Sequence, residues 1–365
     1  MKINMLKLLA AVSAAAVLSG CGATGGAAQS AGSAASSQGQ EAKLQVTTTV
    51  FPAYDFARAV CGDLAEVTLL LPPGAESHSY EPTPKDIMNV GNSDLFMYLG
   101  GESDTWVETL LKTVDDGVSR MKMMDCVELK EEAEIEGMTA EEGHSHSGDD
   151  HDQDEDAHDE DAENHEEDAH EQDVDAHDED EPEETHGQVL EYDEHVWTSP
   201  VNAAAITTAI GERMAELDPA HAEDYRANAA DYTEKLMELD KEFEDFFATV
   251  SNKTMVFGDR FPLRYFADEY GINCYAAFPG CSTQTEPSAA TIAFLTEKVK
   301  EEGLGTVYYI EFSNHLVADS IAEATGAQTA LFHSCHNVSK AEMDAGATYL
   351  TLMEGNLETL KTTMK

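Results

Sequence analysis

Short apolar runs, each followed by residues at helical spacing, recur along the first part of the chain. The runs cover residues 44–50, 67–71 and 95–99. Apolar residues return at helical spacing over 51–60, and Thr83-Pro84 is typical of a helix start. Because the runs are continuously apolar or β-branched rather than alternating, they predict parallel strands that helices cover on both faces.

The same alternation returns after residue 250. Its strand candidates are 254–257, 275–278, 306–310 and 328–332, with a helix near 288–301. From Glu223 to Val250 the chain lacks Gly and Pro, which predicts one helix of more than about 20 residues. The expected fold class is α/β, with two lobes that each contain a mostly parallel sheet flanked by helices. A long rigid helix joins the lobes, and a ligand cleft lies between the carboxyl ends of their sheets.

The N-terminal residues have the composition of a targeting segment followed by a tether. Lys2 and Lys7 precede an apolar run over 8–18, which is shorter than the ~20 residues needed to span a bilayer. The following Leu18-Ser19-Gly20-Cys21 resembles a bacterial lipobox, and this resemblance implies cleavage before Cys21 and lipidation of its thiol. Gly, Ala, Ser and Gln dominate residues 22–43, as in flexible linkers. We therefore expect an extracytoplasmic protein that is anchored to the bacterial cell membrane by lipid.

These patterns divide the chain into consecutive parts. They are a signal peptide over 1–20, a lipidated cysteine and tether over 21–43, a first lobe over 44–200, a linking helical region over 201–250 and a second lobe over 251–365. An acidic, low-complexity insert interrupts the first lobe over 131–190. Cysteines also permit disulfides in an exported protein, with Cys274–Cys281 and, more weakly, Cys61–Cys126 as candidates.

Acidic residues dominate the charge. The chain has 21 Lys and Arg against 72 Asp and Glu, a net charge of −51, and residues 141–187 hold 24 Asp and Glu but no Lys or Arg. A charge this negative argues against nucleic acid as a partner. The insert also contains eight of the 14 histidines, which favours a flexible metal-collecting tract over a solvated loop with incidental histidines. These are His144, His146, His151, His158, His165, His170, His177 and His186.

Three further histidine positions lie where predicted strands meet the cleft. His78 follows the strand that ends at Pro72-Pro73-Gly74, and His195 comes directly after the insert. His333 and His336 follow the last apolar strand. A single loop histidine is usually only solvated. Three positions at equivalent strand ends, beside a histidine-rich tract, indicate a metal site instead.

Two of these motifs resemble those of a known family. One is Leu-Leu-Pro-Pro-Gly-Ala followed by His78 with Tyr80, Pro82 and Pro84; the other is His195-x-Trp197-x-Ser199-Pro200 preceded by Asp193. They resemble the zinc/manganese group of ABC-transporter substrate-binding lipoproteins, over roughly residues 44–365. The resemblance implies a monomer that binds a metal between two lobes and delivers it to a membrane permease and its ATPase. The zinc members look nearest because of the histidine-rich insert.

The resemblance also implies a ligand set. His78 and His195 match the first two family ligands. The third family ligand is a histidine followed by Asp, and here Gly258-Asp259 is aligned with it. His333 falls at the fourth position, a carboxylate in the family. The preferred Zn²⁺ ligands are therefore His78, His195 and His333, completed by Asp259, His336 or water.

Glu311, at another predicted strand end, is a candidate for orienting one of the ligand histidines. An ion pair or a helix cap with Ser313 is an equally good interpretation of this carboxylate. Mn²⁺ is the main rival of Zn²⁺, because it prefers oxygen ligands such as those of Asp259 and Glu311.

Other classes of function remain as alternatives. A metallohydrolase would need a metal with an open position and a general base, but no His-Glu-x-x-His, Gly-x-Ser-x-Gly or Walker pattern is present. We therefore expect no enzymatic activity. A surface lipoprotein that buffers metal or mediates adhesion, with the insert as its active part, is the remaining alternative.

Overall fold

Two four-stranded parallel sheets form the framework of the protein. The computed structural model describes residues 43–364 apart from 78–79, 102–103, 116, 133–134, 136, 139–190, 281 and 283–285. The first sheet has the order β2-β1-β3-β4, and the second repeats this order as β6-β5-β7-β8. The strands of the first sheet are β1 (Leu44–Thr48), β2 (Ala65–Leu69), β3 (Leu95–Tyr98) and β4 (Ser119–Lys122). Those of the second are β5 (Thr254–Phe261), β6 (Asn273–Pro279), β7 (Thr306–Tyr309) and β8 (Gln328–Leu331).

Helices connect the strands of each sheet. In the first lobe they are α1 (Phe51–Cys61), α2 (Pro84–Gly91) and α3 (Thr105–Leu111). In the second lobe they are α6 (Arg264–Tyr270), α7 (Ala289–Glu301) and α8 (Leu316–Thr325). Two further helices, α9 (Lys340–Ala345) and α10 (Tyr349–Thr363), follow the last strand β8. Short 3-10 turns are η3 (Met123–Cys126), η4 (Val196–Thr198) and η5 (Pro219–His221). Several helices begin as their sequences dictate: Thr83 caps α2 by accepting from the backbone of Asp86, whose side chain bonds back to Thr83.

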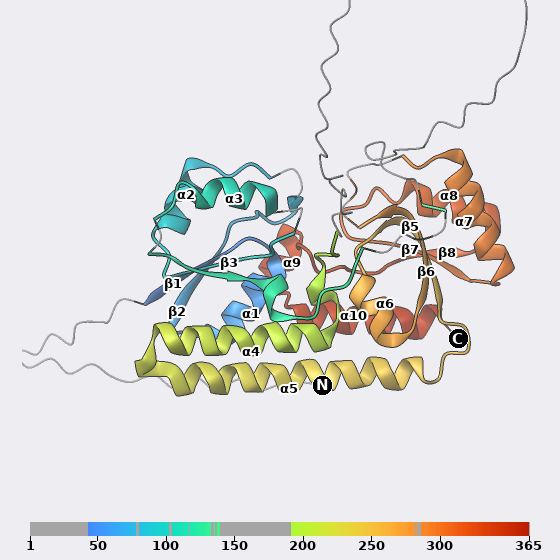
Figure 1. The fold of residues 1–365 in the computed structure, drawn as a ribbon. Helices are drawn as coiled ribbons and strands as arrows, with labels where there is room; N and C mark the ends of the chain where they lie inside the picture. The colour runs from blue at the N-terminus through green and yellow to red at the C-terminus, as the bar shows by residue number, and fades with distance from the viewer. Residues whose placement is uncertain are drawn as a thin grey trace, which may run out of the picture. The chain divides into compact units, whose positions relative to one another are not determined.

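A pair of long helices links the two lobes. Figure 1 shows α4 (Pro200–Leu217) and α5 (Ala222–Phe247) side by side. α5 has 26 residues and contacts α1 of the first lobe as well as α6 and α10 of the second. One hydrophobic core runs through this region, from Val46 of β1 to Leu360 of α10. Because both lobes share that core, residues 43–365 form one unit.

The strand positions largely match the expectations, with instructive differences. The long helix predicted from Glu223 onward is confirmed. β4 was not predicted, because its sequence Ser-Arg-Met-Lys contains a single apolar residue and pairs only at the sheet edge. β5 runs to Phe261, four residues beyond the predicted end, through a register shift between Phe257 and Arg260. The lobe boundaries at residues 200 and 250 stay predictions.

The cysteines correct one expectation. Cys61, Cys126 and Cys274 are free thiols, so the proposed Cys61–Cys126 disulfide is wrong. Cys61 is buried in the core, and burial raises its pKa to about 12. Cys281 lies outside the described residues, and the free thiol of Cys274 does not support the other pairing. No helix in the described part of the chain has the length and apolarity to cross a bilayer.

Candidate metal centre

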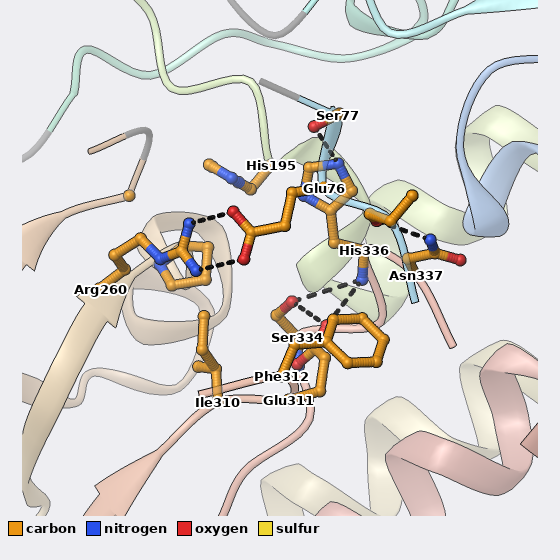
Figure 2. A pocket seen from close by; sticks show the side chains of 13 residues that line it. Glu76, Ser77, His195, Arg260, Ile310, Glu311, Phe312, Ser334, His336 and Asn337 are labelled. Atoms are coloured by element: carbon orange, nitrogen blue, oxygen red, sulfur yellow. Dashed lines mark hydrogen bonds and ion pairs between the residues drawn. The ribbon is translucent and has the colours of Figure 1, made fainter. Parts of the chain in front are cut away.

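The carboxyl ends of the second sheet and two segments of the first lobe enclose a small cavity. Its volume is about 40 Å³. A space of this size holds an ion or a few waters, whereas organic ligands occupy pockets of roughly 300–1,000 Å³. Figure 2 shows the side chains around it. The charged and polar ones include Glu76, Ser77, His195, Arg260, Glu311 and His336.

His195 is fixed in the cavity wall by its own segment. The carboxylate of Asp193 accepts a hydrogen bond from the His195 backbone at 2.8 Å and bonds its Nδ1 at 3.1 Å. Tyr265 donates to the Asp193 carbonyl at 2.8 Å, which anchors this segment on α6. His195 itself is 1% exposed. With Nδ1 held by a carboxylate, Nε2 is the nitrogen available to a ligand, an arrangement that is common for metal-binding histidines.

The charge around His195 favours the protonated ring. Burial alone would lower the pKa of His195. The charge and hydrogen bond of Asp193, with smaller contributions from Glu194 and Glu132, outweigh burial and raise the pKa above its usual value. The same carboxylates attract a divalent cation, so protons and metal compete for this imidazole.

His336 approaches the cavity from the segment after β8. Its ring lies 5.9 Å from that of His195 and 5.2 Å from that of Trp197, measured between centroids. A hydrogen bond of 2.8 Å joins His336 Nε2 to Ser77 Oγ of the first lobe. The indole of Trp197 donates to the Ser334 carbonyl at 2.8 Å. Two histidines that are 141 positions apart in the sequence therefore both pack against the ring of Trp197.

Glu311 supports the segment that carries His336. Its Oε2 accepts from the Ser334 backbone at 2.7 Å, and its Oε1 accepts from the Ser334 hydroxyl at 2.6 Å and the His336 backbone at 3.2 Å. Cys335, between them, has a φ of 62°, a left-handed conformation that is uncommon for this residue type. The carboxylate thus stabilises a turn that the sequence alone would not favour, and this turn places His336 at the cavity.

An ion pair crosses the same cavity. Arg260, in the last part of β5, donates from Nη1 and Nη2 to the two carboxylate oxygens of Glu76 at 3.1 and 3.0 Å. Glu76 belongs to the segment after β2, whose backbone is tied to the second lobe by Asn337. No sequence pattern pointed to a role for Arg260, Glu76 or Ser77. Glu76 and Ser77 stood within the His78 motif, but nothing in the sequence linked them to Arg260 and His336, which lie 184 and 259 positions later.

His333 and Asp259 do not line the cavity. The Nδ1 of His333 accepts a hydrogen bond from the Cys335 backbone at 2.9 Å, and its Nε2 lies 3.7 Å from Glu342. Asp259 accepts from the backbones of Arg260 at 2.8 Å and Ile310 at 3.2 Å. Burial raises the pKa of Asp259, although these hydrogen bonds oppose the shift. Both side chains are therefore engaged inside the second lobe.

The alignment of a family ligand with Gly258 is incompatible with the packing. A Cβ at Gly258 would lie 2.5 Å from the backbone of Ala318 in α8. No side chain fits there. Between Phe257 and Arg260, β5 has one residue more than its partner β6, and such a bulge redirects the side chains that follow it. The position of β5 that reaches the cavity is therefore Arg260, two residues later.

Several predicted residues lie outside the described part of the chain. They are His78, the eight histidines of the insert and the lipidation site Cys21. Within the described residues, no three His, Cys, Asp or Glu side chains are already arranged as a metal cluster. His195 and His336 are the two predicted ligands that the structure brings together.

Comparison with known proteins identifies the family. Residues 46–363 match the ZnuA family, described as zinc-uptake complex component A, periplasmic. The chain belongs to this family. It is a family of transport components rather than of enzymes, and its members act outside the cytoplasm.

Proteins with similar sequences are named for zinc binding or zinc uptake. Zinc-binding protein AdcA of Streptococcus pyogenes is 32% identical over 330 residues, which are 88% of this chain and 56% of that protein. High-affinity zinc uptake system protein ZnuA of Bacillus subtilis is 30% identical and covered over 87% of both chains. The chain thus spans little more than half the length of the AdcA relatives.

A solved structure agrees with the fold. The Zn(II)-bound ZnuA-like domain of Streptococcus pneumoniae AdcA is 28% identical, with a TM-score of 0.64, and the match covers 88% of this chain and 99% of that domain. The expected fold class, two parallel sheets flanked by helices with a long linking helix, is confirmed.

Proposed function

We propose that this ZnuA-family chain is the solute-binding component of a metal ABC importer and that its solute is Zn²⁺. The observation that carries the proposal is the pair of histidines, His195 and His336, on the wall of a cavity of about 40 Å³. Imidazole nitrogen is a preferred ligand of Zn²⁺, and the volume suits an ion rather than an organic solute. Relatives named for zinc binding and zinc uptake support the same solute.

His195 and His336 act as ligands in this proposal, one from each side of the cavity. Asp193 holds the His195 ring through Nδ1, which is the usual role of a carboxylate behind a metal-binding histidine. Glu311 instead fixes the backbone that carries His336. His78, which follows Ser77 in the chain, remains the proposed third ligand. His333 faces Glu342 rather than the cavity, which supports His336 as the ligand in place of His333. Asp259 serves the fold rather than the metal, because both of its oxygens accept backbone hydrogen bonds.

The nature of these side chains favours Zn²⁺ over Mn²⁺. Mn²⁺ prefers carboxylate, carbonyl and water oxygens, whereas two imidazoles at the site suit Zn²⁺. A ligand set rich in oxygen, which would favour Mn²⁺, would need both Asp259 and Glu311 as ligands. Asp259 lies away from the cavity, and Glu311 is engaged by three hydrogen bonds from Ser334 and His336.

The remaining parts of the proposal concern location and partners. Lipidation at Cys21 would hold the protein at the outer face of the membrane, beside the permease and ATPase that receive the ion. A relative from Streptococcus pneumoniae is named a zinc-binding lipoprotein, which supports an anchor of this kind. We propose that the protein works as a monomer and that its acidic, histidine-rich insert collects metal ions.

Competition titration tests the solute directly. The purified chain is titrated with Zn²⁺ and, separately, with Mn²⁺ against a chelator of known affinity. We expect one tight Zn²⁺ site per chain and weaker binding of Mn²⁺. Tighter binding of Mn²⁺, or no tight site for either ion, would contradict the proposal. Zinc-dependent growth of cells that lack the protein would then test its role in uptake.

A further inference from the structure

A permanent positive charge stands inside a cavity that we propose to hold a cation. The guanidinium of Arg260 keeps its charge at every physiological pH. Its side chain is 18% exposed, so bulk water screens it only weakly. Any ion between His195 and His336 shares the same space of about 40 Å³ with this guanidinium. Arg260 must therefore oppose the entry of a divalent cation unless something offsets its charge.

Glu76 makes the largest contribution to offsetting the charge of Arg260, and the charges of Asp259 and Glu311 add smaller ones. Both carboxylate oxygens of Glu76 accept from the guanidinium of Arg260, in the two-bond geometry that makes such pairs strong. The carboxylate is 43% exposed and faces the cavity, as Figure 2 shows. Glu76 is thus a negatively charged oxygen donor at the cavity wall, and Arg260 offsets its charge.

Resting on the proposed function, we infer that Glu76 is a further ligand of the bound ion and that Arg260 occupies its place in the metal-free protein. A divalent ion that enters the cavity takes the Glu76 carboxylate from Arg260, and the guanidinium turns away. Arg260 thereby sets the selectivity of the site. An ion that binds the two imidazoles strongly gains enough binding free energy to break the ion pair between Arg260 and Glu76. An ion that binds nitrogen weakly does not.

The two partners of the pair make opposite predictions. Removing Arg260 in the Arg260→Ala variant breaks its ion pair with Glu76 and lowers the repulsion of the ion, so Zn²⁺ affinity should rise by about tenfold. Removing the charge in Glu76→Gln takes away a ligand, so affinity should fall by about tenfold or more. If the pair only held the two segments together, both variants would break the same contact and change the affinity in the same direction.

The experiment measures Zn²⁺ and Mn²⁺ affinity of the full chain by chelator competition, with circular dichroism to confirm folding. Arg260→Lys retains the charge but not the two-bond geometry, and should stay closer to the unaltered chain than Arg260→Ala does. Arg226 and Glu212 form a similar two-bond pair on the exposed surface of α4 and α5, away from the cavity. Arg226→Ala and Glu212→Gln are therefore matched controls for charge, and should leave the affinity unchanged.

Selectivity gives a second measurement. Arg260→Ala should narrow the preference for Zn²⁺ over Mn²⁺, because the barrier against weakly binding ions is gone. Tight binding by the unaltered chain, with weaker or equal Zn²⁺ binding by Arg260→Ala, would overturn this inference alone. Absence of tight Zn²⁺ binding by the unaltered chain would overturn the proposed function and this inference with it.

Discussion

His195 and His336 differ from His333 in what their side chains face. The first two line the cavity, whereas His333 is turned toward Glu342 and accepts a hydrogen bond from the Cys335 backbone. Replacement of either cavity histidine by alanine should weaken Zn²⁺ binding by more than the roughly 10–100-fold that loss of an orienting partner costs. Calorimetry or chelator competition on the single variants checks this.

His333→Ala is the informative comparison. We expect it to change Zn²⁺ affinity by less than about tenfold, because the side chain does not line the cavity. It should instead lower the free energy of unfolding by roughly 1–3 kcal/mol, since the buried backbone N–H of Cys335 loses its acceptor. A loss of affinity as large as that of His336→Ala, with stability unchanged, would restore His333 as a ligand.

The raised pKa of His195 sets the pH dependence of metal binding. The metal binds neutral imidazole, and a raised pKa means that protons compete at a higher pH than for a free histidine, near ~6.5. Zn²⁺ affinity should be at its maximum at pH values well above the pKa of His195. It should decline as the pH falls through that pKa. Titrations in steps between pH 8 and pH 5 measure this loss.

Asp193 gives that prediction a control. Asp193→Asn removes the carboxylate that raises the pKa of His195, so the loss of affinity should begin at a lower pH. The absolute affinity at pH 8 should also fall, because the orientation of the ring is weakened. An affinity that is flat from pH 8 to pH 5 in the unaltered chain would argue against histidine ligands altogether.

At the scale of elements, Gly258 tests the packing of β5 on α8. A Cβ at this position would lie 2.5 Å from backbone atoms of Ala318, so Gly258→Ala should destabilise the fold by roughly 1–3 kcal/mol. Gly355, in α10, has open space around it and is the matched control. Gly355→Ala should be neutral or stabilising by about 0.5–1 kcal/mol. Urea unfolding followed by circular dichroism separates the two, and equal stabilities would contradict the described packing.

The elements that the sequence predicted well are those whose signal is local. Continuous apolar runs located seven of the eight described strands. A parallel strand that is buried on both faces is apolar along its whole length, so its own sequence reveals it. The long helix α5 was equally visible, since no Gly or Pro interrupts it. β4 was missed because a strand at a sheet edge needs little apolar sequence, and its hydrogen bonds depend on β3.

The site was harder to predict because it depends on contacts between distant segments. His195 and His336 were both named from the sequence, but the choice of His336 over His333 depends on the turn at Cys335 and its support by Glu311. The position of Arg260 depends on a bulge in β5 that apolar periodicity does not reveal. Its partner Glu76 lies 184 residues away, so no local pattern links the two.

At the scale of the whole molecule, the acidic insert and the cavity should bind metal independently. The cavity is built from packed segments that share one core, whereas a polar tract must lose chain entropy each time it surrounds an ion. Calorimetric titration of the full chain with Zn²⁺ should therefore show a tight class and a weak class of site. Deletion of residues 141–187 should abolish only the weak class.

That deletion also separates the alternatives for the whole protein. A metal-buffering surface protein would lose its principal binding capacity with the insert. An importer component keeps its tight site and continues to support growth at low zinc. Loss of the tight class on deletion would contradict the independence of the two.

The central claim is that one Zn²⁺ ion binds between His195 and His336. Anomalous diffraction at the zinc absorption edge, from crystals of the zinc-loaded protein, tests it most directly. We predict one strong peak in the cavity, about 2.0–2.1 Å from a ring nitrogen of each histidine. A peak beside His333 and Glu342, or a cavity without zinc in a loaded crystal, would contradict this account.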